Sequence, residues 1–218
     1  MKIDRSLATA TLGAVLILCG CTSYKDIMEQ YMRQQAEMVA AAKAKPLPPL
    51  PDYPDDAKSA YDTSARLVVV GQGDESAVIR TALKEAGCNV LAGSVAQTAV
   101  FQRPDLVLSP SCTYNVVHGD GSSWLQVRLV ICIRRAIRLA VNGSVEQVPE
   151  PRIFQMYARV PIPDNAAAYH VPDGSVTSLG QLAVERAKGE ARGQEALKQA
   201  VARLMRIDAF RRAISEMK

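Results

Sequence analysis

Alternating apolar and polar residues predict a β-meander in the middle of the chain. The stretch WLQVRLVICI has an apolar residue at every second position, which is typical of a strand with one buried face. The stretch PDLVLSPSCTYNVV alternates in the same way, and the glycine-rich turn HGDGSS joins the two. The register that brings both apolar faces together sets Cys112 opposite Leu129 and Tyr114 opposite Val127.

A third strand follows the hairpin. The Asn-Gly pair at 142–143 is typical of a tight hairpin turn. Setting Leu129 opposite Met156 keeps the same face apolar over this strand. Pro149 and Pro151 predict that the strand begins irregularly or lies at the edge of the sheet.

A strand, a helix and a second strand precede the meander. Arg66–Gly71 is typical of a buried strand, and a helix begins after it with Asp74 as its N-cap and ends at Gly87. CNVLAG, residues 88–93, is predicted to be the second strand, which makes a βαβ unit. Ser76 stands where a dinucleotide fingerprint needs its third glycine, so nucleotide binding is not expected.

Helical spacing returns at the C-terminus. Ser178–Lys218 is predicted to be helical, with Asp208 capping a last turn. Gly189 and Gly193 predict either a break or a close approach of the helix to the sheet. The whole pattern predicts an α+β fold, in which a βαβ unit and an antiparallel meander form a mixed sheet with a C-terminal helix.

The residues before this domain predict a helix and a spacer. Tyr24–Lys45 has apolar residues at helical spacing, which fits a marginal amphipathic helix, or a stalk that pairs with a second copy or lies on a membrane. Lys45–Asp56 carries prolines that favour an extended polyproline conformation, so we expect a spacer.

The N-terminus has the pattern of an export signal, with two basic residues, an apolar run and then cysteine. Leu18-Cys19-Gly20-Cys21 resembles the lipobox of bacterial lipoproteins. The resemblance implies cleavage after Gly20 and acylation of Cys21. Thr22 replaces the aspartate that usually retains such proteins in the inner membrane, which implies the periplasmic leaflet of the outer membrane. The expected organisation is a signal peptide at 1–20, a tether at 21–63 and a periplasmic domain at 64–218.

Charge and cysteine content add few constraints. The net charge of +4 is spread along the chain without a polybasic block, so no nucleic-acid partner is expected. After processing, Cys88, Cys112 and Cys132 remain beside the anchor. One disulfide involving Cys88 and three free thiols are both open, because Cys112 and Cys132 are predicted to lie on opposite faces of the sheet.

The polar face of the meander is the candidate partner-binding surface. A tryptophan beside arginine and tyrosine is the composition of an interface hot spot. The alternatives are that the C-terminal segment covers this face or that it is a solvated surface. The predicted face comprises Asn115, Trp124, Gln126, Arg128, Gln155, Tyr157 and Arg159.

The sequence offers little for catalysis. His118 and Asp120 lie near Ser122 and Ser123, but these residues form a hairpin tip without a third group to orient the histidine. His170 is the second of two histidines, too few for a zinc site. We therefore expect no enzyme, no metal and no cofactor.

The order of elements from about Arg66 to Met205 loosely resembles periplasmic lipoproteins of the LpoB type and of the CsgG N-terminal type. LpoB-like proteins use a proline-containing tether and activate peptidoglycan synthases by contact, whereas CsgG-like proteins form secretion pores. Arg128 is unsuited to a lipid-facing strand, which argues against a pore.

The expected function is a non-enzymatic, lipid-anchored envelope protein that acts as an adaptor or as an assembly or activator factor. The alternatives are a periplasmic small-ligand-binding protein, a hydrolase or a secretion-complex subunit. Homo-oligomerisation stays open.

Overall fold

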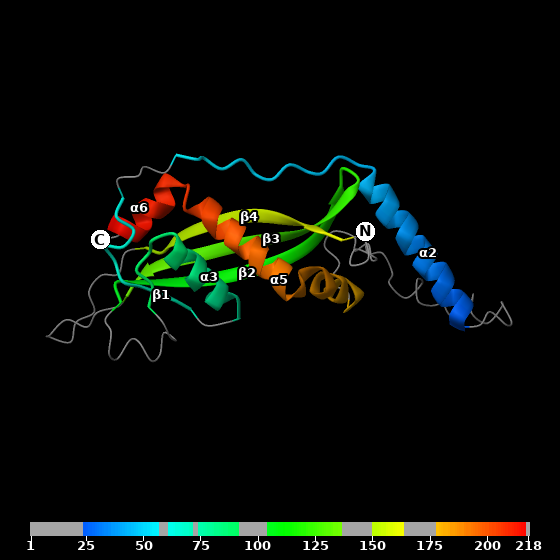
Figure 1. Cartoon of the computed structure of the whole chain (residues 1–218), viewed down its shortest axis with the longest axis horizontal. Coiled ribbons are helices and arrows are strands. Elements are labelled where there is room, and N and C mark those ends of the chain that lie inside the picture. Colours follow the sequence, from blue (N-terminus) through cyan, green and yellow to red (C-terminus); the bar gives the residue numbers. More distant parts are fainter. Residues whose placement is uncertain are drawn as a thin grey trace, which may run out of the picture.

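The computed structural model describes residues 24–56, 61–71, 74–91, 104–136, 150–163 and 178–216. They form the predicted α+β fold (Figure 1). The elements follow in the order α2 (Tyr24–Lys43), β1 (Val68–Val70), α3 (Asp74–Glu85), β2 (Leu106–Gly119), β3 (Ser122–Arg135), β4 (Arg152–Ile162), α5 (Ser178–Leu204) and α6 (Asp208–Glu216).

The described strands form one mixed sheet in the order β1-β2-β3-β4. β1 is parallel to β2, and the other neighbours are antiparallel. The predicted register is confirmed, since Tyr114 faces Val127 and Leu129 faces both Cys112 and Met156. Every second residue of β3 from Ser123 to Ile133 is buried, because this register gathers the apolar side chains of three strands on one face.

The start and the position of β4 agree with the prediction made from Pro149 and Pro151. β4 begins at Arg152, directly after Pro151, and lies at the edge of the described sheet. Proline cannot donate to a strand ladder, which explains why the strand starts only there. The predicted turn at 142–143 lies outside the described residues.

The βαβ unit is present in a shortened form. β1 has three residues, all of them buried, and α3 begins at Asp74. Gly87 has a φ of 86°, a left-handed conformation that suits the predicted helix end. Of the predicted strand at 88–93, the described residues contribute a single parallel bridge between Val90 and Val68.

The C-terminal segment forms two helices instead of one. Gly189 has φ 36° and ψ 150° and breaks α5, which confirms the first of the two predicted roles of the glycines. A Cβ at Gly193 would lie 2.8 Å from Cγ of Lys188, so this glycine accommodates a lysine stem from its own helix rather than the sheet. α6 begins at Asp208, as predicted, and buries Phe210.

The core lies between the apolar face of the sheet and the helices that pack on it. α5 contacts β2, β3, β4 and α3, and Figure 1 shows α3 and α5 across the same face of the sheet. Leu197, Val201 and Leu204 of α5 are buried there. At one end, the rings of Phe154 and Phe210 meet edge to face with centroids 5.1 Å apart, which packs α6 against β4.

The proline-rich segment Lys45–Asp56, which we call the proline belt, runs along the domain rather than away from it (Figure 1). At its start, the N–H of Asp120 in the β2–β3 turn donates to the carbonyl of Lys45 at 2.9 Å. At its end, Oδ1 of Asp56 accepts a 2.8 Å hydrogen bond from the N–H of Asp208. The belt therefore differs from the expected free spacer, since both of its ends are bonded to the folded domain.

We expect Asp56→Ala to lower the free energy of unfolding by about 1 kcal/mol, because Asp56 caps the first N–H of α6. Urea denaturation monitored by circular dichroism measures this change. The matched control is Asp55→Ala, whose 3.8 Å ion pair with Arg206 joins two exposed side chains and should contribute less than about 0.5 kcal/mol. Equal losses in the two variants would contradict the capping role.

Candidate functional site

The candidate surface is the face of the meander that points away from the helices. It consists of the odd-numbered residues of β2 and β4 and the even-numbered residues of β3. The predicted face residues all lie here, with Arg128 opposite Tyr157 and Asn115 in line with Gln126. α5 and α6 pack on the opposite face, so these described helices do not cover the surface.

The charge of this surface has one sign. Its strand positions include Arg128, Arg134 and Arg159 and contain no aspartate or glutamate within the described strands. Arg135, the last residue of β3, points to the opposite face. A positive surface without carboxylates favours an acidic partner over a basic one.

The proline belt occupies the end of the surface that is next to the β2–β3 turn. A Cβ at Gly119 would lie 2.6 Å from Cα of Leu47, so the belt crosses directly above this glycine. Two strands away, Nη1 of Arg159 donates to the carbonyl of Pro48 at 2.6 Å. In the register of the sheet, Trp124 of β3 lies between Gly119 and Arg159, and its Nε1 is inaccessible to solvent.

This arrangement corrects part of the predicted surface. The hot-spot hypothesis requires Trp124 and Tyr157 to be exposed, but both side chains are half-buried. Nε of Arg159 donates to Oε1 of Gln126 at 2.7 Å, and both side chains are half-buried. Burial and the nearby Arg203 lower the pKa of the Arg159 guanidinium. Trp124, Gln126 and Arg159 therefore line the path of the chain's own belt and are not a free partner surface.

The rest of the surface, which we call the free patch, is formed by Arg128, Gln155, Tyr157 and Ile153. Nη2 of Arg128 donates to Oε1 of Gln155 at 2.8 Å, and Nε2 of Gln155 donates to the Tyr157 hydroxyl at 2.9 Å. Ile153 is 68% exposed, more than the other exposed large hydrophobic residues of the described chain. The free patch thus combines an ordered polar row with an apolar side chain in solvent.

The backbone of Tyr157 also forms hydrogen bonds at the outer edge of β4, where no other described strand pairs with it. Nη1 of Arg203 on α5 donates to its carbonyl at 3.0 Å, and its backbone hydrogen-bonds the phenol of Tyr53 in the belt. Burial, followed by the charge of Tyr157, raises the pKa of the Tyr53 phenol. These contacts cap the strand edge at this residue, which blocks pairing with another strand there.

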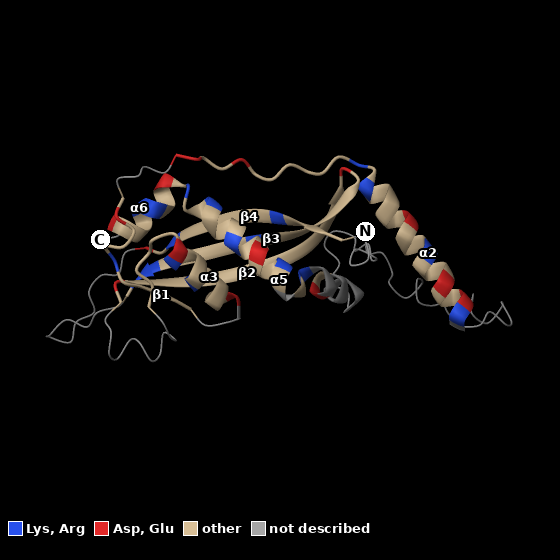
Figure 2. Ribbon diagram, viewed as in Figure 1, with Lys and Arg blue, Asp and Glu red and all other residues tan. Residues whose placement is uncertain are grey.

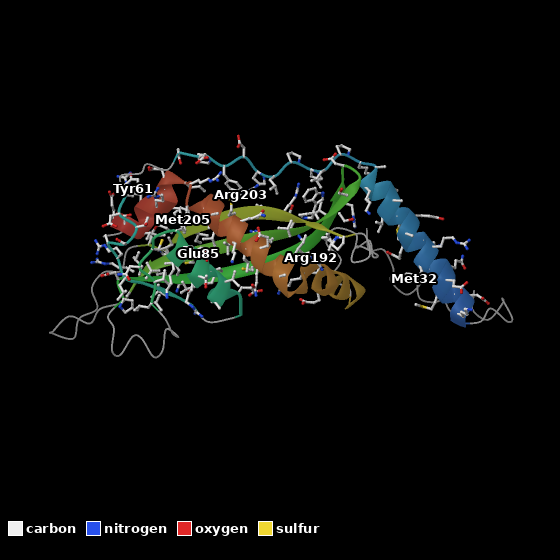
Figure 3. All side chains as sticks on the ribbon, in the orientation of Figure 1. Met32, Tyr61, Glu85, Arg192, Arg203 and Met205 are labelled. Carbon is white, nitrogen blue, oxygen red and sulfur yellow. The ribbon has the colours of Figure 1, made fainter. Side chains whose placement is uncertain are left out.

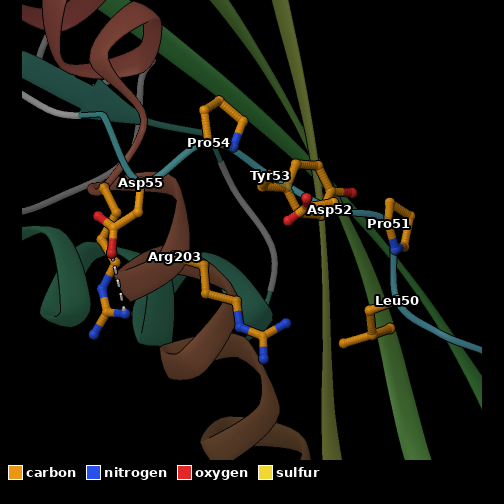
Figure 4. A pocket seen from close by; sticks show the side chains of 8 residues that line it. Leu50, Pro51, Asp52, Tyr53, Pro54, Asp55 and Arg203 are labelled. Atoms are coloured by element: carbon orange, nitrogen blue, oxygen red, sulfur yellow. Dashed lines mark ion pairs between the residues drawn. The ribbon is translucent and has the colours of Figure 1, made fainter.

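A hollow of about 470 Å³ lies where the belt passes over α5 and the start of α6. Tyr53, Asp55 and Arg203 line it, together with belt prolines (Figure 4). The ion pair between Asp55 and Arg206 closes one side. Since the belt forms most of its wall, this hollow depends on the belt staying docked.

A second hollow, of about 850 Å³, lies beside α6. Nε of Arg212 is 3.2 Å from a carboxylate oxygen of Glu216, and the guanidinium of Arg66 lies 4.0 Å from Asp105. These arginines of its wall therefore already face carboxylates of the chain. In the parts of the chain that the structure describes, no group of three or more His, Cys, Asp or Glu is placed to hold a metal ion.

One cluster on the helix-covered face was not foreseen from the sequence. Nζ of Lys188, just before the break in α5, lies 4.6 Å from the ring centre of Tyr114 and 3.3 Å from a carboxylate oxygen of Glu75. Burial raises the pKa of Tyr114, and its hydroxyl has no hydrogen-bond partner among the described residues. Gly189 marked the break, but no local signal marked the partners of Lys188, which come from α3 and β2.

The histidine and serine of the hairpin tip meet. Nδ1 of His118 lies 2.8 Å from Oγ of Ser123. Ser123 is 1% exposed, so a substrate has no access to its hydroxyl in this conformation. Asp120 has a φ of 50° in the adjoining turn and is exposed. The pair therefore joins two strands at the tip and does not form an accessible nucleophilic site.

The anchor residues Gly20 and Cys21 lie outside the described residues. Among the helices that the structure describes, none has both the length and the apolar character needed to cross a bilayer.

Comparisons with known proteins do not define a family. No protein-family model and no curated protein matches the chain. Among solved structures, the chain is similar to the hypothetical protein CT253 from Chlamydia trachomatis, with a TM-score of 0.30 and 8% sequence identity, over 64% of this chain and 95% of that one. A likeness at this level supports no conclusion about function.

We expect Gly119→Ala to loosen the belt, because the added methyl group would meet the Leu47 backbone at 2.6 Å. Trp124 should become more accessible, with stronger quenching of its fluorescence by acrylamide. Ser111→Ala, at an exposed position of the same strand, is the control and should leave quenching unchanged. Unchanged quenching in Gly119→Ala would show that the belt does not cover Trp124.

Cys88, Cys112 and Cys132 are free thiols. Thiol labelling should show that Cys112 reacts very slowly in the folded protein. Burial, then the charge of Glu75, raises the pKa of Cys112 to about 12. Since the thiolate reacts, about 10⁻⁴ of Cys112 is reactive at pH 8, and labelling should rise about tenfold per pH unit up to that pKa. Mass spectrometry after brief iodoacetamide treatment at pH 8 should find Cys112 unmodified in the folded protein and modified in urea. Fast labelling of Cys112 in the folded protein would contradict its burial.

Proposed function

We propose that the protein is a non-enzymatic, lipid-anchored envelope adaptor that binds an acidic protein partner through the free patch. The lipobox-like residues Leu18-Cys19-Gly20-Cys21 supply the anchor, with Cys21 acylated, and Thr22 favours the periplasmic leaflet of the outer membrane. The domain supplies the binding surface.

One observation carries the choice of surface. The described helices α3, α5 and α6 pack on one side of the sheet, and the belt takes only one end of the other side. Arg128, Tyr157 and Ile153 are left at the free patch. Arginine and tyrosine are enriched in interface hot spots, and the Arg128–Gln155–Tyr157 row is already ordered by hydrogen bonds. Little side-chain entropy would therefore be lost when a partner binds.

The alternative functions find less support. A hydrolase needs an accessible nucleophile beside a base, and Ser123 is buried. A small-ligand binder needs a cavity where polar groups converge. The first hollow is formed mainly by the belt, and in the second hollow Arg66 and Arg212 face carboxylates of the chain. A pore subunit would have to place Arg128 on a lipid-facing strand.

We expect Arg128→Glu to reduce capture of the partner by about tenfold, which corresponds to roughly 1.4 kcal/mol, because it introduces repulsion with an acidic surface. The measurement is cross-linking in intact envelopes, purification of the protein and mass spectrometry of what is bound. Lys198→Glu is the matched control, since it makes the same charge change at an exposed position of α5.

The melting temperatures of both variants should stay close to that of the wild type, because Arg128 is exposed. Cys21→Ser provides a second arm and should lose the membrane fraction together with the captured partner. Equal capture by Arg128→Glu and the wild type would rule out the free patch. Retention of Cys21→Ser in the membrane would rule out the acyl anchor.

A further inference from the structure

Exposed apolar side chains are concentrated on α2. The exposed large hydrophobic residues of the described chain are Ile27, Met28, Met32 and Met38 on this helix, together with Ile153 on β4. Figure 3 places Met32 in the part of α2 that projects away from the sheet. Ile153 belongs to the free patch, so α2 needs an explanation of its own.

The first two turns of α2 have two distinct sides. At about 100° per residue, Tyr24, Ile27, Met28, Tyr31 and Met32 fall within an arc of about 140°. The charged residues of these turns lie outside that arc, and they are Lys25, Asp26, Glu29 and Arg33. Figure 2 shows acidic and basic residues side by side on this helix. The apolar side is therefore separated from a charged side of no net charge.

The position of the anchor places these turns beside lipid. α2 begins three residues after Cys21. Three extended residues span about 10 Å at most. If Cys21 is acylated, as the proposed function states, Ile27 and Met28 cannot move far from the membrane surface.

We propose that residues Tyr24–Met32 dock on the lipid surface, with Ile27, Met28 and Met32 inserted among the headgroups. An amphipathic helix lies in the interface with its apolar side buried to a shallow depth. The docking rests on the proposed acyl anchor, which raises the local concentration of the helix at the membrane so that a few apolar side chains suffice.

A second copy of α2 is a poorer occupant for the same side. Gln35 and Val39 continue the apolar arc toward the end of the helix, and both are already buried, with 8% exposure. After Met32, Met38 is the one large apolar side chain of this helix that is exposed, so the free apolar side is continuous only over the first two or three turns. A coiled coil needs an apolar seam of three or more heptads.

Docking would also orient the domain. The far end of α2 is bonded to the β2–β3 turn, where Gly121 N–H donates to the Lys43 carbonyl and Asp120 N–H donates to the Lys45 carbonyl, both at 2.9 Å. A helix fixed at both ends transmits its orientation on the membrane to the sheet. The free patch would then face a defined direction relative to the lipid.

Depth-dependent quenching tests this arrangement in the mature, acylated protein. In a Trp124→Phe background, tryptophan is placed at Met28 or at Glu29, which are adjacent in sequence, but only Met28 lies within the apolar arc. Each variant is reconstituted in vesicles of phosphatidylethanolamine and phosphatidylglycerol that contain brominated lipid. We expect quenching of Met28→Trp to exceed that of Glu29→Trp by about threefold, because only the apolar side faces the lipid. Ile27→Trp, a second position on the apolar side, should behave like Met28→Trp.

Equal quenching at positions 28 and 29, or none at either, would overturn the docking. A blue-shifted emission of Met28→Trp without brominated-lipid quenching would show contact with protein, including a second copy, and would overturn it as well. Intact mass measurement separates these results from failure of the proposed function: absence of acyl chains on Cys21 would refute the anchor itself. Circular dichroism establishes that each variant retains the fold.

Discussion

Burial of a single face of the meander is the constraint on which the rest of the structure depends. Leu125, Val127, Leu129, Ile131 and Ile133 are fully buried on one side of β3. α3, α5 and α6 are all needed to cover that side of the described sheet. Burial of apolar area drives this packing at roughly 25 cal/mol per Å², and it leaves the other side without a helical layer. The arginine-bearing surface, the belt and the free patch all follow from this asymmetry.

The proline belt shows how an exposed sheet surface can be covered without adding another strand. Proline has no N–H, so the belt offers mainly carbonyl groups and cannot extend the sheet. Arg159 and the turn residue Asp120 donate to these carbonyls. At its end, the belt supplies a carboxylate to the start of α6. One segment therefore lies over Gly119, caps a helix and connects the N-terminal helix to the C-terminal one.

The features that the sequence predicted are those with a local or periodic signal. Alternation over three strands specifies a register, because a shift of one residue would turn every apolar side chain to the wrong face. Gly87 and Gly189 marked a helix end and a helix break through their backbone freedom.

Contacts between distant segments carried no such signal. The docking of the belt depends on Gly119 and Arg159, far from it in sequence, and a proline-rich stretch has no periodic apolar side that would reveal which surface it covers. The association of Lys188 with Tyr114 and Glu75 is equally non-local. For this reason the predicted surface was right as a face of the sheet, but Trp124 and Tyr157 were wrongly expected to be exposed, since both are half-buried.

The docked belt changes what the proposed anchor would imply for a partner. A free helix and spacer together would let the domain reach several tens of ångströms from the lipid, whereas a belt bonded to the domain leaves only α2 as the link. Twenty helical residues span about 30 Å, and docking of the first two turns on lipid would shorten this reach further. The proposed adaptor would therefore search a thin layer next to the membrane, where its effective concentration would be high. A partner for the free patch is therefore best sought among envelope proteins whose acidic surface lies close to that same leaflet.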